Sequence, residues 1–192
     1  VDMLVFVGMP LSVRGRLYDV AAAVYSGDLL GFVPLTNVKN SRFSRPPSGM
    51  VEVEIAGFDT VFLNPDLLFE YEMQPGLVVA VQMGADNQIP MPPAVRHAAA
   101  GATVIVQMDS FPMSAYSARD VKCDTIVGSR RLQCGWISAA PGKGESTTDK
   151  AYSGLCFISE AGEILASQEN GSGMIVTELD MEYIVDLRRR AD

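Results

Sequence analysis

Short runs of apolar residues, each bounded by turn-forming residues, recur along the whole chain and predict many strands. The continuous apolar run at residues 3–7 is typical of a strand that is covered on both faces, and residues 77–83 are expected to form another buried strand. Residues 51–55 instead alternate apolar residues with glutamate, as a strand with one exposed face does. Further strands are expected at residues 59–63, 102–108, 136–140 and 174–179.

Two pairs of apolar runs are predicted to form hairpins, because each pair flanks a tight turn. The first hairpin joins residues 16–26 to residues 29–35, and the second spans residues 155–167. A polar, proline-rich stretch at residues 36–49 predicts a long loop between two of the strands.

Three helices are expected among these strands, at residues 94–100, 117–134 and 181–190. The longest of them carries an apolar stripe, and Arg130 and Arg131 near its end are expected to face water. Strand-helix-strand units beside several hairpins predict a mixed α/β sandwich.

We expect one domain over residues 1–192, because the chain is long enough to bury a core and shows no repeat or linker. The strand-like run at Met3 has only two residues before it, so we expect the chain to begin inside a larger fold. A buried strand at that place needs neighbours on its edge and faces, which predicts a dimer or a larger assembly.

The net charge of −8 and the pI near 4.6 argue against a nucleic-acid surface, which needs clustered lysine and arginine. The basic cluster at residues 188–190 is expected to be a solvated helix end. No apolar run is long enough to cross a bilayer, and the first residues lack the pattern of a signal peptide. Together these features predict a cytoplasmic protein without nucleic-acid or membrane partners.

Cysteine and histidine, the residues that most often bind transition metals, are few. The three cysteines, Cys123, Cys134 and Cys156, lack metal-like spacing and are expected to be small buried hydrophobic residues of a reduced protein. The single histidine, His97, excludes a site with several histidine ligands and is expected at the surface. We therefore predict neither a metal ion nor a cofactor.

A dense polar loop, Glu145-Ser146-Thr147-Thr148-Asp149, follows a glycine- and proline-rich turn between two expected strands. A loop of this composition is suited to face a ligand or a substrate. The same side chains can instead satisfy neighbouring backbone groups and have no other role. The residues alone leave both interpretations open.

Three stretches of the chain together resemble one family. They are residues 7–11 with 15–22 (VGMPL and GRLYDVAA), residues 101–106 (GATVIV), and residues 141–149 with 158–166 (PGKGESTTD and ISEAGEILA). In these motifs the chain resembles the carbon-nitrogen hydrolase (nitrilase) superfamily, and most of all the N-terminal glutaminase domain of glutamine-dependent NAD synthetases. The resemblance extends from about Met3 to about Arg190 and implies an α-β-β-α sandwich.

The resemblance also implies a reaction. In this family a cysteine attacks the substrate amide, a glutamate acts as general base, and a lysine stabilises the negatively charged oxygen of the tetrahedral intermediate. The ammonia that is released passes to a separate synthetase domain.

This sequence departs from the family pattern at each of the three catalytic positions. The segment that normally contains the cysteine is Gln82-Met83-Gly84-Ala85-Asp86, so Gly84 occupies the position of the nucleophile. Leu35 follows Val33-Pro34 at the position of the lysine, and Lys39 has the wrong spacing to replace it. The family's glutamate belongs to a segment that would precede Met3.

The substitutions predict a carbon-nitrogen hydrolase-like domain that has no catalytic residues, cannot hydrolyse glutamine and is retained for structure or assembly. One alternative is a module that binds a small amide or nucleotide without reacting, in a vestigial pocket with Asp86, Glu145 and Ser146. Another is a piece of an active glutamine-dependent NAD synthetase. Asp86 either lines such a pocket or caps a loop. The expected partner is a second copy or a synthetase domain, and the sequence does not identify the small-molecule ligand.

Overall fold

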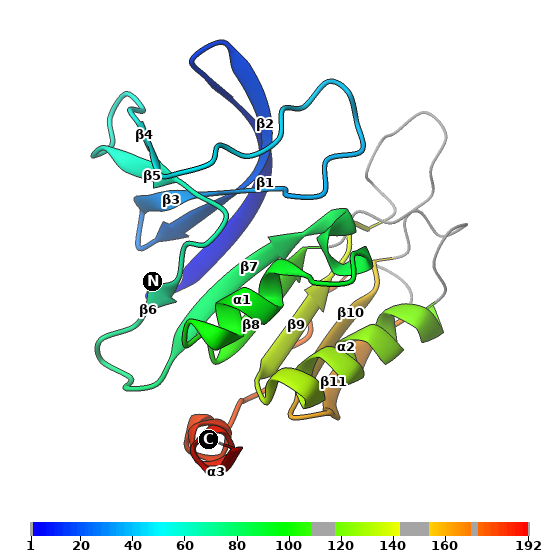
Figure 1. Cartoon of the computed structure of the whole chain (residues 1–192). Coiled ribbons are helices and arrows are strands. Elements are labelled where there is room, and N and C mark those ends of the chain that lie inside the picture. The colour runs from blue at the N-terminus through cyan, green and yellow to red at the C-terminus, as the bar shows by residue number, and fades with distance from the viewer. Residues whose placement is uncertain (1, 109–117, 143–153, 170–172, 192) are drawn as a thin grey trace.

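Two β-sheets face each other in the computed structural model, which describes residues 2–108, 118–142, 154–169 and 173–191 (Figure 1). The first sheet has the strand order β1-β2-β3-β5-β4. Its strands are β1 (Leu4–Val13), β2 (Arg16–Tyr25), β3 (Asp28–Pro34), β4 (Val51–Val53) and β5 (Val61–Leu63).

The second sheet has the strand order β11-β10-β9-β8-β7-β6, and its centre is parallel. Its strands are β6 (Phe69–Glu70), β7 (Val78–Met83), β8 (Val104–Met108), β9 (Gly135–Ala139), β10 (Cys156–Glu160) and β11 (Glu163–Gln168). The helical segments are the 3-10 helix η1 (Gly84–Gln88), α1 (Pro93–Ala99), α2 (Ala118–Leu132) and α3 (Met181–Ala191). The parallel strands β7, β8 and β9 are therefore joined through α1 and α2.

Tight turns connect the first three strands: the hairpin of β2 and β3 is the one that the sequence predicts, whereas the hairpin of β1 and β2 is not predicted. Arg14 and Gly15 have φ angles of 49° and 75°, and Ser26 and Gly27 have φ angles of 51° and 97°. Positive φ at both central residues is the signature of the type I′ turn, whose twist matches that of the flanking strands. The predicted hairpin at residues 155–167 is also confirmed, because β10 and β11 pair antiparallel.

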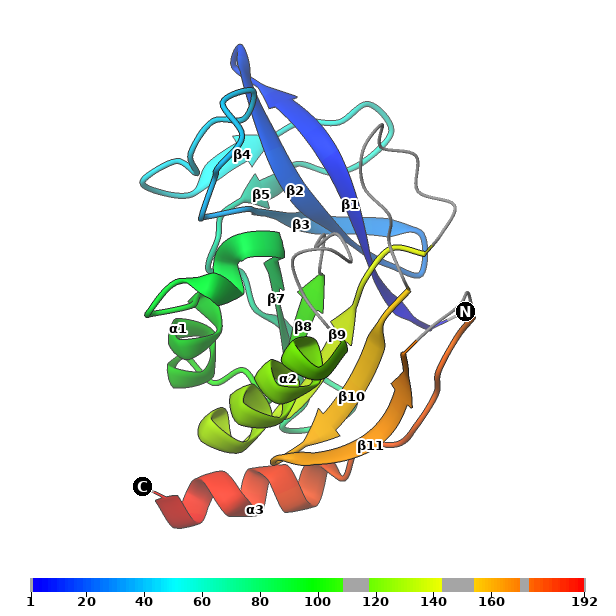
Figure 2. The ribbon, with the colours of Figure 1, turned by 90° about the vertical axis from the view of Figure 1, so that its right-hand side faces the viewer.

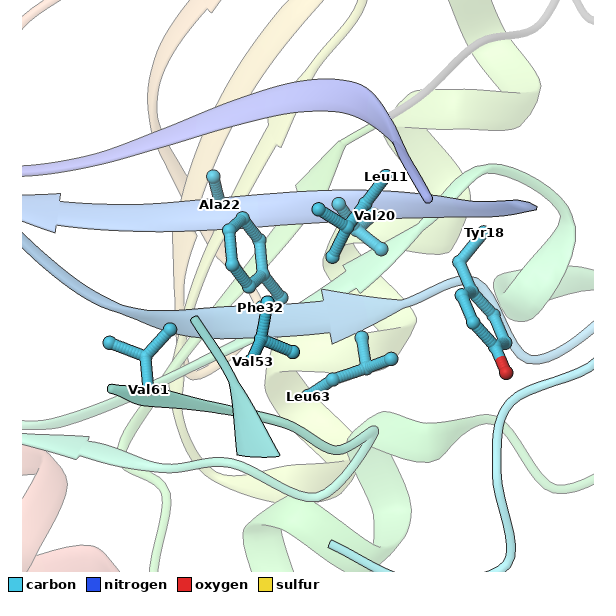
Figure 3. Packing of buried hydrophobic residues seen from close by; sticks show 8 residues of the cluster. All are labelled: Leu11, Tyr18, Val20, Ala22, Phe32, Val53, Val61 and Leu63. Carbon is cyan, nitrogen blue, oxygen red and sulfur yellow. The ribbon is translucent and has the colours of Figure 1, made fainter. Parts of the chain in front are cut away.

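The core between the sheets is apolar and has contributions from both. Ala21 and Val33 of the first sheet pack with Val81 and Met83 of the second. On its other face, the first sheet carries a separate cluster that includes Val20, Phe32 and Leu63 (Figure 3). Successive residues such as Val20 and Ala21 thus enter different clusters, because side chains alternate across a strand.

The outer face of the second sheet is covered by α1 and α2 (Figure 2). Gly128 of α2 allows a close approach there, since a Cβ atom at this position would meet the Trp136 ring at 2.7 Å. The third helix is held differently, through Arg188, which donates hydrogen bonds to the carbonyl oxygens of Ala98 and Ala102. The described residues thus show a helix-sheet-sheet arrangement. None of their helices is long and apolar enough to cross a membrane.

Two of the strand predictions are wrong in detail. Residues 173–180 form no ladder, and Met174 and Val176 are 85% and 74% exposed. The run at residues 3–7 lies in a strand, but it is not covered on both faces, because Val7 is half-exposed. Among the described strands β1 pairs only with β2, so one edge of β1 is also unpaired. An apolar run indicates extended backbone, whereas coverage depends on which neighbours are present.

Candidate functional site at the carboxyl ends of β3 and β7

The carboxyl ends of β7, β8 and β9 lie together at one edge of the second sheet. Parallel pairing aligns Met83 with Met108, and Met108 with Ala139. Open α/β sheets bind ligands outside this edge. Gly84 follows β7 directly and begins η1 with a φ of 45°, in the left-handed region that favours glycine.

Asp86 is the most heavily hydrogen-bonded acid at this edge. Its carboxylate is 1% exposed and accepts hydrogen bonds from the backbone N–H groups of Thr36 and Asn37, at 3.0 Å and 2.6 Å. The Thr36 hydroxyl adds a third hydrogen bond at 2.7 Å. Asn37 reciprocates, because its side-chain Nδ2 donates to the Ala85 carbonyl at 2.8 Å. Asp86 therefore caps the loop after β3 and ties the first sheet to the second, as one of the two interpretations expects.

Leu35 lies in an apolar environment between the sheets. Its side chain packs against the inter-sheet cluster that contains Val33 and Met83. Its backbone N–H donates to the Asp19 carbonyl at 2.8 Å. Burial, with a smaller contribution from the nearby Asp86 carboxylate, raises the pKa of the Asp19 side chain. The closest lysine in the sequence, Lys39, directs its ammonium to the Gln88 side chain at 2.9 Å in an exposed position.

A buried pair of amide side chains, Gln82 and Gln107, supports the same edge, and the sequence pattern predicts no role for this pair. Nε2 of Gln82 donates to Oε1 of Gln107 at 2.6 Å, and Oε1 of Gln82 accepts from the Ala94 backbone N–H at 3.0 Å. Gln107 in turn donates to the Gly84 carbonyl at 3.3 Å. Both side chains are 1% exposed. One sequence feature could have indicated this pair: the expected strands that end at Met83 and Met108 both end with Gln-Met.

The chain is similar in sequence to curated synthetases. It is 35% identical over 194 residues to the glutamine-dependent NAD(+) synthetases of Mycobacterium tuberculosis and Mycobacterium bovis, and 32% identical to that of Mycobacterium leprae. Each alignment covers 96% of this chain and 28% of the relative. The chain thus spans little more than a quarter of the length of these relatives. No protein-family model matches it.

Solved structures show the same fold. A glutamine-dependent NAD(+) synthetase from Cytophaga hutchinsonii matches 88% of this chain and 28% of its own, with a TM-score of 0.72 and 18% identity. Saccharomyces cerevisiae Nit3, a member of branch 10 of the nitrilase superfamily, matches 98% of this chain and 64% of its own, with a TM-score of 0.71 and 14% identity. This chain has the carbon-nitrogen hydrolase fold. The sandwich expected from the sequence is confirmed.

The three cysteines of the carbon-nitrogen hydrolase-like domain occupy different environments. Cys134 is fully buried at the amino end of β9, and burial raises its pKa to about 12. Cys156, on β10, is half-buried, and Cys123, on α2, is exposed. The prediction of a small buried hydrophobic residue is therefore confirmed for Cys134 and wrong for Cys123.

His97 corrects a second expectation about the domain, since it is 1% exposed instead of lying at the surface. Its Nε2 lies 2.9 Å from the Pro65 carbonyl oxygen, which can only accept, so this nitrogen carries the proton. Nδ1 is buried and has no hydrogen-bond partner among the described residues. Burial lowers the pKa of His97. The alanines around it allow α1 to lie close to the sheet, which places His97 inside.

Two of the three residues predicted for a vestigial pocket, Glu145 and Ser146, lie outside the described residues, and so does the rest of the polar loop. The pocket therefore stays a prediction. Arg130 and Arg131 are exposed, as expected. In the described part of the domain, no three His, Cys, Asp or Glu side chains gather as a metal site requires.

A cavity of about 680 Å³ lies between the sheets of the domain and extends along the parallel strands, from Leu77 and Val104 near their amino ends to Met108 and Ala139 at their carboxyl ends. The residues that line it have apolar side chains or none, and they include Phe6 and Gly8 of β1, Met108 of β8 and Ala139 of β9. Neither Gly84 nor Asp86 contributes to it.

Proposed function

We propose that this domain does not hydrolyse glutamine and serves a structural or assembly role in an NAD-synthetase-like protein. The observation that carries the proposal is Gly84. It follows β7 at the ligand-binding edge of the sheet, where the family resemblance places a cysteine. An acyl-enzyme forms only if a side-chain atom attacks the amide carbon, and glycine has none.

The surroundings of Leu35 support the same proposal. An ammonium placed at this position would stabilise the oxyanion of the intermediate. Leu35 instead contributes to the apolar cluster between the sheets, and the ammonium of Lys39 is held at the surface by Gln88. Two of the three chemical groups that the reaction needs are thus replaced by groups that cannot supply their function.

Two of the three cysteines, Cys134 and Cys156, lie on or next to a strand of the second sheet but are badly placed to substitute for the missing thiol. Strand pairing connects Cys156 to Met83 through Ala139 and Met108, three strand spacings away. That separation is about 14 Å. Cys134 precedes β9 at the opposite edge of the sheet. Neither sulfur is within reach of a carbonyl bound at Gly84.

The decisive experiment treats the purified chain with a diazoketone analogue of glutamine and follows the intact mass, together with ammonia release from glutamine. We expect no adduct and no ammonia above the buffer blank. The Mycobacterium tuberculosis synthetase serves as the positive control. An adduct on any cysteine, or turnover that scales with protein concentration, would refute the proposal.

A pair of restoring variants sharpens the experiment. Gly84→Cys supplies a thiol, and the double variant with Leu35→Lys supplies an ammonium as well. Labelling of the introduced thiol in either variant, with none in the parent chain, would show that position 84 faces the ligand site and that glycine alone removes the chemistry. If the reagent instead labels one of the three native cysteines, equally in the parent chain and in the variants, the assignment of position 84 to the ligand site is contradicted.

A binding module is the second candidate, favoured by the cavity of about 680 Å³ between the sheets, which reaches Met108 and Ala139 at the same edge. Cavities of this size accommodate small ligands. Calorimetric titration with glutamine, glutamate, nicotinic acid adenine dinucleotide and ATP distinguishes the two candidates. Saturable binding without turnover supports the module, whereas no heat across the panel supports the structural role.

The whole protein could then make NAD from free ammonia, since the domain corresponds to only 28% of the length of its curated relatives.

We further propose a cytoplasmic location and association with a second copy or a synthetase domain. Light scattering of the purified chain tests self-association, and a monomer at micromolar concentration would contradict that part.

A further inference from the structure

A second cavity, of about 370 Å³, lies at the other end of β7. Its lining residues are Leu4, Tyr25 and Leu30 from the first sheet, and residues 69–73, Leu77 and Val79 from the β6–β7 hairpin. Val79 precedes Gly84 by about 16 Å of extended strand. This cavity is therefore distant from Gly84, although it shares Leu4, Leu77 and Val79 with the cavity of about 680 Å³.

Aromatic rings form much of its wall. Tyr25 and Tyr71 approach each other with ring centroids 6.2 Å apart and planes tilted by 51°. Phe69 is fixed by an edge-to-face contact with Phe6, with centroids 5.5 Å apart. The faces of aromatic rings carry partial negative charge and attract cations, most strongly where several rings meet.

The charged residues that line the cavity are all acidic. Glu70 and Glu72 lie on and just after β6, both are exposed, and no lysine, arginine or histidine lines the cavity. Within the described part of the chain, neither glutamate forms an ion pair. Two unpaired carboxylates beside aromatic faces give the cavity a negative potential, in a chain whose net charge is already −8.

The rim of the cavity exposes apolar surface to water. Leu30 is 42% exposed, Tyr71 39% and Met73 79%. A simple inorganic cation gains nothing from such surface, whereas an alkylated cation buries its substituents against it. A methionine at the rim also adapts easily to the shape of a ligand.

We propose that this cavity binds a small organic cation whose ammonium group carries alkyl substituents. The aromatic rings face the alkylated nitrogen, Glu70 and Glu72 balance its charge, and Leu30 and Met73 cover its apolar parts. The proposal is independent of whether the domain hydrolyses glutamine.

The experiment titrates the purified chain with choline and with tetramethylammonium, and follows amide and tyrosine ring signals by NMR. The neutral carbon analogue 3,3-dimethylbutan-1-ol, which has the shape of choline without its charge, is the matched control ligand. We expect saturable shifts at Tyr25 and Tyr71 with both cations and no saturation with the neutral analogue.

Two variants test the residues directly. Tyr71→Leu keeps an apolar side chain without the ring and should weaken choline binding by about 2- to 30-fold, the range that one cation-π contact supplies. The double variant Glu70→Gln/Glu72→Gln should weaken choline binding and reduce its salt dependence. The matched control Glu52→Gln/Glu54→Gln removes two exposed acids at β4 and should leave choline affinity unchanged.

Thermal unfolding confirms that each variant is folded before its affinity is compared. Equal saturation by choline and its neutral analogue would overturn the proposal. So would the absence of shifts at Tyr25 and Tyr71 with either cation, or an equal effect of the two double variants.

Discussion

The carboxylate of Asp86 accepts a hydrogen bond from the backbone N–H of Asn37, with Oδ1 2.6 Å from the nitrogen. Asn37 follows β3 of the first sheet, Asp86 follows β7 of the second, and the two residues are 49 positions apart in the chain. This contact holds the loop after β3 against η1, which follows β7. An acid that the family pattern places beside its nucleophile thus has a structural role here.

Replacing Asp86 should be costly. In Asp86→Asn, the amide nitrogen either replaces Oδ1 and faces the N–H groups of Thr36 and Asn37, or replaces Oδ2 and faces the Thr36 N–H alone. Both orientations set donor against donor. We expect the free energy of unfolding to fall by about 2 to 4 kcal/mol, measured by urea denaturation. The exposed acid Asp59 provides the control, and Asp59→Asn should change stability by less than about 0.5 kcal/mol. Equal stability of the two variants would show that the contact is dispensable.

His97 should make the stability of the domain depend on pH. Burial lowers its pKa below the ordinary value of 6.5, so the neutral form is favoured by folding. The contribution of neutral His97 to the free energy of unfolding is fully present above pH 6.5. It decreases as the pH falls toward the folded-state pKa, by at most about 1.4 kcal/mol per pH unit. Unfolding experiments between pH 7 and pH 5 measure this slope.

His97→Leu provides the comparison for that slope, because His97 is the only histidine. The raised pKa of Asp19 acts in the opposite direction, and it contributes equally to parent and variant. The stability of the parent relative to the His97→Leu variant should therefore fall toward acid pH. A constant difference across the range would exclude a role for His97.

Gly84 should resist substitution for a reason unrelated to catalysis. Its φ of 45° lies in the left-handed region, where a Cβ atom costs about 1 to 2 kcal/mol. Gly84→Ala should lower the free energy of unfolding by about that amount. Gly49 has no positive φ and open space around it, so Gly49→Ala should be neutral or slightly stabilising. A stabilising Gly84→Ala would contradict the backbone geometry.

The contact between Gly128 and Trp136 predicts a clash. In an exposed helix, Gly→Ala stabilises by about 1 kcal/mol. Here a Cβ atom would meet the indole ring at 2.7 Å, so Gly128→Ala should destabilise by about 1 to 3 kcal/mol. Thermal unfolding monitored through Trp136 fluorescence measures the effect. The neighbouring Val127→Ala, at a half-exposed position of the same helix, should be nearly neutral.

The three cysteines should react with a thiol reagent in a fixed order. Cys123 is exposed and should react within the native state, whereas Cys134 is fully buried with a pKa of about 12 and should react only after unfolding. Time-resolved mass spectrometry of peptides after alkylation records the order. In the control variant Cys123→Ser, the fast phase of alkylation should disappear. Early labelling of Cys134 would contradict its burial.

Local features of the fold could be predicted well from the sequence. The turn at Ser26 and Gly27 determines its hairpin through neighbouring residues alone, and the apolar stripe of α2 has the helical period. The extended segment at Met174 has the same apolar character as a strand, yet it finds no partner strand. Pairing depends on the tertiary arrangement, which a single sequence pattern does not contain.

The candidate site was predictable only in part. Gly84 and Leu35 could be located because the family resemblance fixes the segments around them. The hydrogen bonds of Asp86 to Thr36 and Asn37 join positions about 50 residues apart, and no local pattern signals them. The burial of His97 likewise follows from how closely α1 packs on the sheet.

The connections of the strands also have a consequence for folding kinetics. The strands β1, β2 and β3 are joined by two-residue turns, so their ladders can form by local closure. The ladders among β7, β8 and β9 require longer crossovers, and bringing distant segments together is intrinsically slow. We therefore expect the hairpin half to gain protection against hydrogen exchange early in refolding, while assembly of the parallel half limits the overall rate.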